Sequence, residues 1–175
     1  MKCDASKEVS KMAAIQWTQN MSVGIQSIDA DHQILVSMVN RLADAIKTAR
    51  GKETVSSILD ALLDYTTYHF GREEVLMQAC GYPDLDAHRH THKVLRTQVA
   101  HIRERYRGNP ETIYDREVLG FLKNWLTSHI MGRDKLYAPF MTSRRDAVEK
   151  AEAAYAERVV KEPELAALQN AGTAA

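Results

Sequence analysis

The sequence predicts an all-α protein built as an antiparallel up-down four-helix bundle, and three observations support this fold class. Apolar residues recur at the three-and-four spacing of amphipathic helices in four successive segments. Turns containing Gly and Pro separate the segments, and no stretch of useful length alternates as a β-strand would. Because the connections are short, consecutive helices should be antiparallel neighbours.

The first two helices are expected after a polar N-terminal arm, residues 1–27, which shows little helical periodicity. The first helix begins near Asp29, a candidate N-cap, and ends before Gly51. The second spans about 54–80, and Gly81 closes it before a turn at 81–84. The first apolar stripe consists of Ile34, Leu35, Met38, Val39, Leu42, Ile46 and Ala49.

The third helix is expected to begin between Pro83 and Asp86 and to stop at 108–110, and the fourth to span about 111–130. Beyond Pro139 the composition shifts to Ala, Glu, Lys and Arg. A weak stripe there predicts an extra helix with a frayed polar end, formed by Val148, Ala151, Tyr155 and Val159.

These elements divide the chain into an arm (1–27), a bundle (28–140) and a C-terminal helical extension (141–175) that we expect to be partly flexible. The extension can pack on its own bundle, pair with a second copy or dock a protein partner. Packing on its own bundle is the favoured of the three.

Composition excludes several classes of partner. Lys+Arg and Asp+Glu number 23 each, so no global basic field is available for nucleic acid or an anionic membrane. No stretch approaches the ~20 apolar residues that would insert into a bilayer. Cys3 and Cys80 lie in different contexts, which argues against a disulfide framework and favours a reducing cytoplasm. A monomer is expected.

Five histidines and two acids recur at intervals that metal binding explains. Imidazole and carboxylate suit first-row transition metals, and four separate segments each supply at least one such group. Residues four apart lie about 40° apart on a regular helix, so such pairs face one point. The candidate ligands are His32, His69 with Glu73, His88 with His92, and His129 with Asp134.

The step from His129 to Asp134 is the exception, because five residues rotate by about 140° on a regular helix. Both side chains reach one point only if the helix ends or deforms between them. Gly132 inside the interval and Pro139 shortly after it make local unwinding a reasonable solution.

A single inward histidine is usually a hydrogen-bonded core residue. Here four expected helices each place one inward, and burying the whole set without partners would cost several kcal/mol, which a metal cluster removes. Six other acids and histidines are left out of the candidate ligand set. Asp29, Glu74, Asp84 and Asp86 are interpreted as caps, turns or solvated faces, and His90 and His101 fall off the ligand spacing.

Histidines with two bridging carboxylates and no thiolate favour iron or manganese over structural zinc. The Glu-x-x-His pairs of ferritin-like proteins are absent. The pattern instead resembles the hemerythrin family, most closely the single-domain bacteriohemerythrins, over about residues 17–140. The resemblance rests on Val23-Gly24-Ile25, Ile28-Asp29-x-x-His32, Tyr68-His69-Phe70, Glu73-Glu74, Met77, Gly81-Tyr82-Pro83, His88-x-x-x-His92, Trp125-Leu126-x-x-His129-Ile130 and Asp134-Lys135.

This resemblance implies two iron ions with a bridging oxo or hydroxo group. It assigns three histidines to one iron (His88, His92, His129), two to the other (His32, His69), and Glu73 and Asp134 to the bridge. The iron with two histidines keeps an open position, which implies reversible dioxygen binding by a carrier, storage or delivery protein. Trp17, Leu35, Phe70, Trp125 and Leu126 are hypothesised to wall the oxygen pocket, though each also suits an ordinary bundle core.

Two other functions stay open at this point. One is a di-iron oxygen or redox sensor that signals through the extension, and the other is an enzyme that reduces peroxide, oxygen or nitric oxide. A tyrosine or glutamate added to the ligand set would favour oxidase chemistry, and no spare acid lies at a matching spacing. A binding protein is therefore expected, with weak oxidase or peroxidase activity still open.

Overall fold

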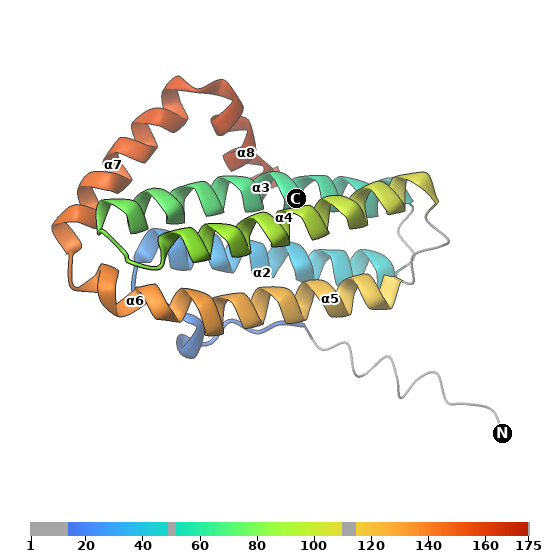
Figure 1. Ribbon diagram of the computed structural model, residues 1–175. Helices are drawn as coiled ribbons and strands as arrows, with labels where there is room; N and C mark the ends of the chain where they lie inside the picture. Colours follow the sequence, from blue (N-terminus) through green and yellow to red (C-terminus); the bar gives the residue numbers. More distant parts are fainter. Residues whose placement is uncertain (1–13, 49–51, 110–114, 175) are drawn as a thin grey trace.

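Four long helices form the body of the computed structural model, which describes residues 14–48, 52–109 and 115–174. Each helix runs opposite to the one before it (Figure 1), and the described residues contain no β-strand. The predicted all-α up-down bundle is therefore confirmed. Its helices are α2 (Gln26–Lys47), α3 (Lys52–Ala79), α4 (Leu85–Gly108) and α5 (Asp115–Ser128).

The N-terminal arm lies along the bundle and determines where α2 begins. The backbone of Ile15 bonds the side chain of Asn40 twice, at 2.8 and 2.9 Å. Asp29 accepts hydrogen bonds from the Ser22 hydroxyl (2.5 Å) and the Val23 N–H (2.7 Å). The prediction of Asp29 as N-cap is therefore wrong: α2 starts three residues earlier, and Asp29 uses its carboxylate to bind the arm.

Turn glycines and helix ends agree with the sequence where they are described. Gly81 follows α3 with φ of +65°, a left-handed conformation that favours glycine, and α4 stops at Gly108. Gly51 and the expected start of the fourth helix at 111 lie outside the described residues.

The fourth bundle helix does not stop near residue 130 as predicted. A six-residue π-helix, η3 (His129–Asp134), follows α5 directly. The chain then continues as α6 (Lys135–Thr142), with Pro139 inside the helix. Of the two expected solutions, an end or a deformation, the helix therefore takes the second and continues.

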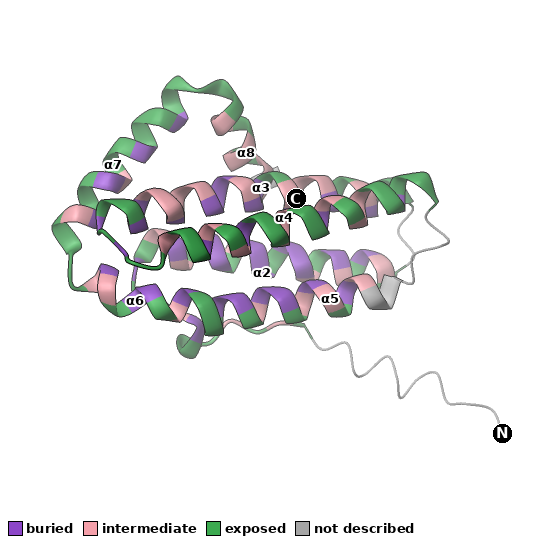
Figure 2. Cartoon of the chain, viewed as in Figure 1, coloured by how far each residue is buried: buried purple, intermediate pink, exposed green. Residues whose placement is uncertain are grey.

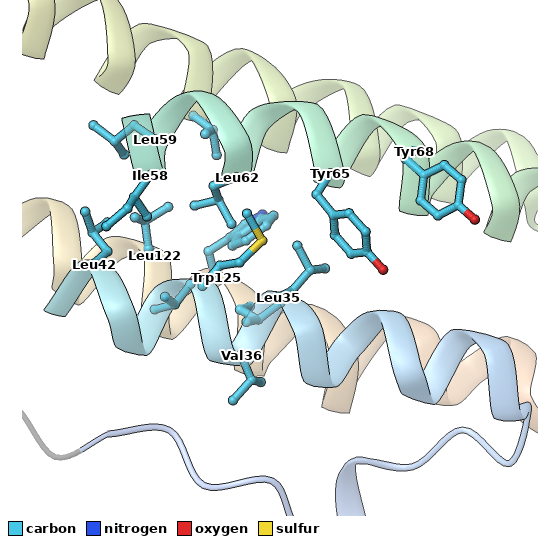
Figure 3. Close-up of a cluster of buried hydrophobic side chains, with 14 of the residues drawn as sticks. Leu35, Val36, Leu42, Ile58, Leu59, Leu62, Tyr65, Tyr68, Leu122 and Trp125 are labelled. Atoms are coloured by element: carbon cyan, nitrogen blue, oxygen red, sulfur yellow. The ribbon is translucent and has the colours of Figure 1, made fainter. Parts of the chain in front are cut away.

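Two apolar clusters lie one after the other along the bundle. The larger includes Leu35, Leu62 and Trp125, which extend from α2, α3 and α5 into one interior (Figure 3). The smaller includes Ile28, at the start of α2. Along α2, His32 lies between Ile28 and Leu35, so the polar candidate ligands occupy the layer between the two clusters.

Burial follows the inward faces of the helices, as Figure 2 shows for α2 and α5. Most of the outer surface of α4 is exposed in the same view. Within the described ranges, no helix combines the length and apolarity needed to cross a membrane.

The C-terminal extension forms two further helices, α7 (Arg145–Lys161) and α8 (Pro163–Ala174), on the α3 side of the bundle (Figure 1). The predicted stripe is buried in α7, so the extension packs on its own bundle. Where a frayed end was expected, Pro163 opens α8, as proline often opens a helix, and the expected flexibility of the extension stays a prediction. Leu165 and Leu168 of α8 pack against the larger apolar cluster.

Candidate metal centre

All seven predicted ligands are buried and face one another in the middle layer of the bundle. α2 supplies His32, α3 supplies His69 and Glu73, α4 supplies His88 and His92, and η3 supplies His129 and Asp134. None is more than 5% exposed. Helices that alternate in direction thus deliver histidines from four separate segments to one point. The histidines left out, His90 and His101, are exposed.

The cluster divides into two unequal groups that share one carboxylate. In one, ligand atoms of Glu73, His88, His92 and His129 lie within 4.8 Å of one another. In the other, atoms of His32, His69 and Glu73 do so. We call these the three-histidine half and the two-histidine half.

Both carboxylates reach both halves. Glu73 places Oε2 3.1 Å from His92 Nε2 and Oε1 3.6 Å from His32 Nε2. Asp134 places Oδ1 3.2 Å from His129 Nε2 and Oδ2 3.3 Å from His32 Nε2. Each acid therefore lies between the halves, where a bridging ligand would have to be.

The π-helix brings His129 and Asp134 to the same side of the backbone. In a π-helix the hydrogen bonds run between residues five apart, so each turn is wider than in an α-helix. A five-residue step then returns to nearly the same face, and Asp134 is fully buried. The predicted deformation between these two residues is confirmed.

Many inward-facing nitrogen and oxygen atoms of the seven residues have no hydrogen-bond partner. Within the described residues, most buried side-chain nitrogen and oxygen atoms without a hydrogen-bond partner belong to this cluster, including Nε2 of His32, His88, His92 and His129, Oε2 of Glu73 and both oxygens of Asp134. Buried polar atoms normally have hydrogen-bond partners. A bound metal ion would explain why so many atoms at one place have none.

Electrostatics also favours a cation at this place. Burial disfavours a charged His32, but hydrogen bonds and opposite charge from Asp134 and Glu73 outweigh burial and raise its pKa to about 10. Burial disfavours a charged Glu73 too, yet the surrounding histidines hold its pKa well below the usual value. For His129 burial prevails and lowers the pKa to about 4. Two buried carboxylates thus attract positive charge, which a metal ion can supply.

A family model described as the hemerythrin HHE cation binding domain matches residues 23–141. The chain belongs to the hemerythrin family. It is 38% identical over 127 residues to a bacteriohemerythrin of Stenotrophomonas maltophilia, a match that covers 73% of this chain and 81% of that protein. A bacteriohemerythrin of Methylococcus capsulatus is 33% identical, with 75% of this chain and 100% of that protein covered.

A solved structure shows the same likeness. The crystal structure of a wild-type hemerythrin is similar with a TM-score of 0.68 at 32% sequence identity, covering 74% of this chain and 98% of that chain. The hemerythrin family match ends at residue 141, so α7 and α8 lie outside it.

Sequence reasoning missed Tyr137, which touches the shared carboxylate. Its hydroxyl donates a hydrogen bond to Glu73 Oε1, and the residue is completely buried. Burial, with the negative charges of Glu73 and Asp134, raises the pKa of Tyr137 well above its usual value, so the phenol keeps its proton. A signal was available, because Tyr137 lies three residues after Asp134 and so on the same helical face.

Two further carboxylates bond the outer nitrogens of candidate ligand histidines. Asp31 Oδ2 lies 3.4 Å from His69 Nδ1, and Glu74 Oε1 lies 2.9 Å from His92 Nδ1. The interpretation of Glu74 as merely part of a solvated face is therefore wrong. Asp31 was not singled out, although its spacing from Leu35 places it on the inward face of α2.

The proposed pocket residues lie on the side of the larger apolar cluster. Phe70 stacks on His92 with ring centroids 3.7 Å apart, and its ring lies 5.6 Å from that of His129. The ring of Trp17, from the arm, has its centroid 6.3 Å from that of the His32 ring. Leu35, Trp125 and Leu126 are buried in the cluster itself. Phe70 and Trp17 thus contact candidate ligands, and a role for all five in an oxygen pocket stays a prediction.

Proposed function

We propose that this chain binds dioxygen reversibly at a di-iron centre, as a carrier, storage or delivery protein. The observation that carries the proposal is the pair of buried, unequal histidine groups sharing Glu73, in which most of the inward-facing nitrogen and oxygen atoms have no hydrogen-bond partner. Membership of the hemerythrin family supports a di-iron oxygen-binding protein.

The proposed ligands follow the two halves. His88, His92 and His129 would hold one iron, His32 and His69 the other, and Glu73 and Asp134 would bridge them together with an oxo or hydroxo group. Two ferrous ions held in this way can supply the electrons that dioxygen binding requires. The half with fewer histidines leaves a position for the oxygen.

The chain's own residues would keep the site dry and its ligands fixed. Phe70 covers the face of His92, and the apolar cluster that includes Leu35 and Leu126 excludes water from one side. Tyr137 donates to Glu73 and fixes the carboxylate's orientation. Water-excluded sites suppress proton leakage and other side reactions, so this environment favours reversible binding over turnover.

A binding role therefore fits better than an enzymatic one, and Tyr137 is the residue that tests this reading. A tyrosine near the ligand set would favour oxidase chemistry if it were free to react. Here its hydroxyl is engaged with Glu73, and the raised pKa keeps it protonated as a hydrogen-bond donor.

The sensor reading has one specific observation in its favour. α7 and α8 pack on the bundle next to α3, the helix that carries His69 and Glu73. If ligand state moved the extension, protease cleavage within 141–175 would differ between the reduced and oxygenated protein. Identical cleavage would count against a sensor. For the compartment we propose the cytoplasm, where a buried free thiol such as Cys80 stays reduced.

The deciding experiment is anaerobic reduction of the iron-loaded chain followed by addition of oxygen. We expect about two iron ions per chain and a coloured oxygenated form that bleaches when oxygen is removed. His92→Ala should abolish the colour, whereas His90→Ala, an exposed histidine on the same helix, should keep it. Irreversible bleaching with substrate-dependent turnover would instead indicate an enzyme.

A further inference from the structure

Asp31 is a buried carboxylate with a full set of partners, only one of which is a proposed ligand. Its oxygens lie 3.4 Å from His69 Nδ1 and 2.8 Å from the Tyr65 hydroxyl. Arg72 Nη1 donates to both of them at 3.0 Å. Tyr65 and Arg72 therefore hold the carboxylate at the outer edge of the imidazole.

That contact has a defined effect on a metal-binding histidine. An acceptor at Nδ1 keeps the proton on that nitrogen and leaves the Nε2 lone pair for a metal. In the structure Nε2 of His69 does face the cluster, 3.6 Å from Glu73 Oε2. A carboxylate in this outer position also makes the imidazole a stronger donor.

The C-terminal extension closes over the groups that hold Asp31. The Tyr155 hydroxyl, from α7, donates to the backbone carbonyl of Tyr68 at 2.8 Å. The Arg72 guanidinium lies 4.8 Å from the ring centre of Tyr68, 5.8 Å from that of Tyr155, and also bonds the Tyr68 hydroxyl. α7 thus places the Tyr155 ring near the arginine that bonds Asp31.

Glycines allow this close approach. A Cβ added to Gly71 would lie 2.9 Å from the Tyr155 hydroxyl oxygen. A Cβ on Gly172, in α8, would lie 2.4 Å from two ring carbons of Tyr65. Tyr65 and Tyr68 extend from the same helix (Figure 3), so α7 and α8 cover both tyrosines of the network.

The corresponding carboxylate of the three-histidine half has no such cover. The Glu74 side chain is 25% exposed, and its other partner is Arg89, which is 39% exposed. Asp31, at 4%, is buried beneath the extension. Of these two outer carboxylates, the extension therefore covers the one beside the two-histidine half.

We propose that Asp31 positions His69 for metal binding, and that the C-terminal extension holds Asp31 in place through Tyr155 and Gly172. The inference rests on the proposed function in taking His69 as an iron ligand. It assigns to α7 and α8, which lie beyond the family match, the task of setting the affinity and potential of the iron in the two-histidine half.

The test compares Asp31→Asn with Asp44→Asn, an exposed acid on the same helix, in the full iron-loaded chain. Ferrous iron release to a chelator is followed without oxygen. Asp31→Asn should speed release of one of the two ions about 10–100-fold and raise the midpoint potential, because the weaker imidazole donor stabilises ferric iron less. Asp44→Asn should match the wild type, and Tyr155→Phe should shift both quantities in the same direction by less.

Equal release rates and potentials for Asp31→Asn and Asp44→Asn would overturn the proposal. Circular dichroism checks the fold of each variant. If Asp31→Asn loses helix content, Arg72→Gln takes its place, with the same faster release expected and unchanged release as the refutation. Since release is measured on the ferrous protein, a chain that takes up iron but fails to bind oxygen reversibly would refute the proposed function and leave this result standing.

Discussion

Two segments of the bundle each supply a histidine and a carboxylate, and they do so with different backbones. In α3, His69 and Glu73 are four residues apart on a regular helix. In η3, His129 and Asp134 are five apart, and the helix widens to a π turn. A histidine and a carboxylate thus reach one cluster by two routes, the regular helix α3 and the π-helix η3. Only the second route requires an irregular backbone. The need for convergent side chains, more than local helix preference, therefore explains where the irregularity lies.

The largest effect is expected at the carboxylate on the regular route. Glu73 has oxygens near histidines of both halves, so Glu73→Ala should remove most of the bound iron. Iron content after desalting is the measurement. Glu53→Ala, an exposed acid in the first turn of the same helix, should keep the full amount. Retention of both ions by Glu73→Ala would show that the η3 side holds the metals without α3.

Removing the histidine from the same route should give a smaller, one-sided loss. His69→Ala leaves every ligand of the three-histidine half in place, so we expect about one iron per chain and no oxygenated form. Helix content should stay near that of the wild type because the core is largely aliphatic. Colorimetric iron determination and circular dichroism measure both. A variant that still forms the oxygenated colour would remove His69 from the proposed site.

Residues whose role depends on helical spacing were predictable from the sequence. The inward histidines follow from three-and-four spacing, and the deformation before Asp134 follows from one step that a regular helix cannot satisfy. Both arguments use only the geometry of one helix. They hold because amphipathic faces in a short-looped bundle have only one interior to face.

Residues whose role depends on contacts between elements were not predictable in this way. Asp29 resembles an N-cap in the sequence. In the structure α2 begins before it, and its carboxylate accepts a hydrogen bond from the arm instead. Tyr137 and Asp31 gain their roles from α3, across the bundle. The residues after Pro163 were expected to be a frayed end, yet they form α8, because Leu165 and Leu168 pack against the larger apolar cluster and Gly172 lies against Tyr65.

Protons should compete with iron unequally at His32 of α2 and His129 of η3. In the metal-free chain His32 carries a proton below pH 10, since its pKa is raised to about 10, whereas His129, lowered to about 4, is neutral above pH 5. Iron uptake between pH 6.5 and 9 must then displace the proton of His32 and none from His129. Ferrous affinity should rise about tenfold per pH unit for each proton released.

Calorimetric titration of ferrous iron in two buffers of different ionisation enthalpy measures this release. The raised pKa of His92 adds to the same trend, so iron binding should release one or more protons per chain. His32→Ala should lower the number of protons released by one. An affinity that does not change with pH would contradict the protonated His32 and the charge argument for the site.

The smallest effect is expected for Gly132→Ala, which tests whether the glycine or the convergence of His129 and Asp134 causes the π turn. Gly132 lies inside η3, but it is not among the described glycines with positive φ, and an added Cβ would meet nothing within 4 Å. Gly132→Ala should therefore keep both irons and stabilise the iron-free chain by about 0.5–1 kcal/mol in urea unfolding. Gly120→Ala, in regular α5 and equally unobstructed, is the matched control and should do the same. If only Gly132→Ala lost iron, glycine itself would be needed for the wide turn. Equal behaviour of the two variants would mean that the turn is held by what surrounds it, namely His129 and Asp134 converging on the cluster and α6 packing beyond.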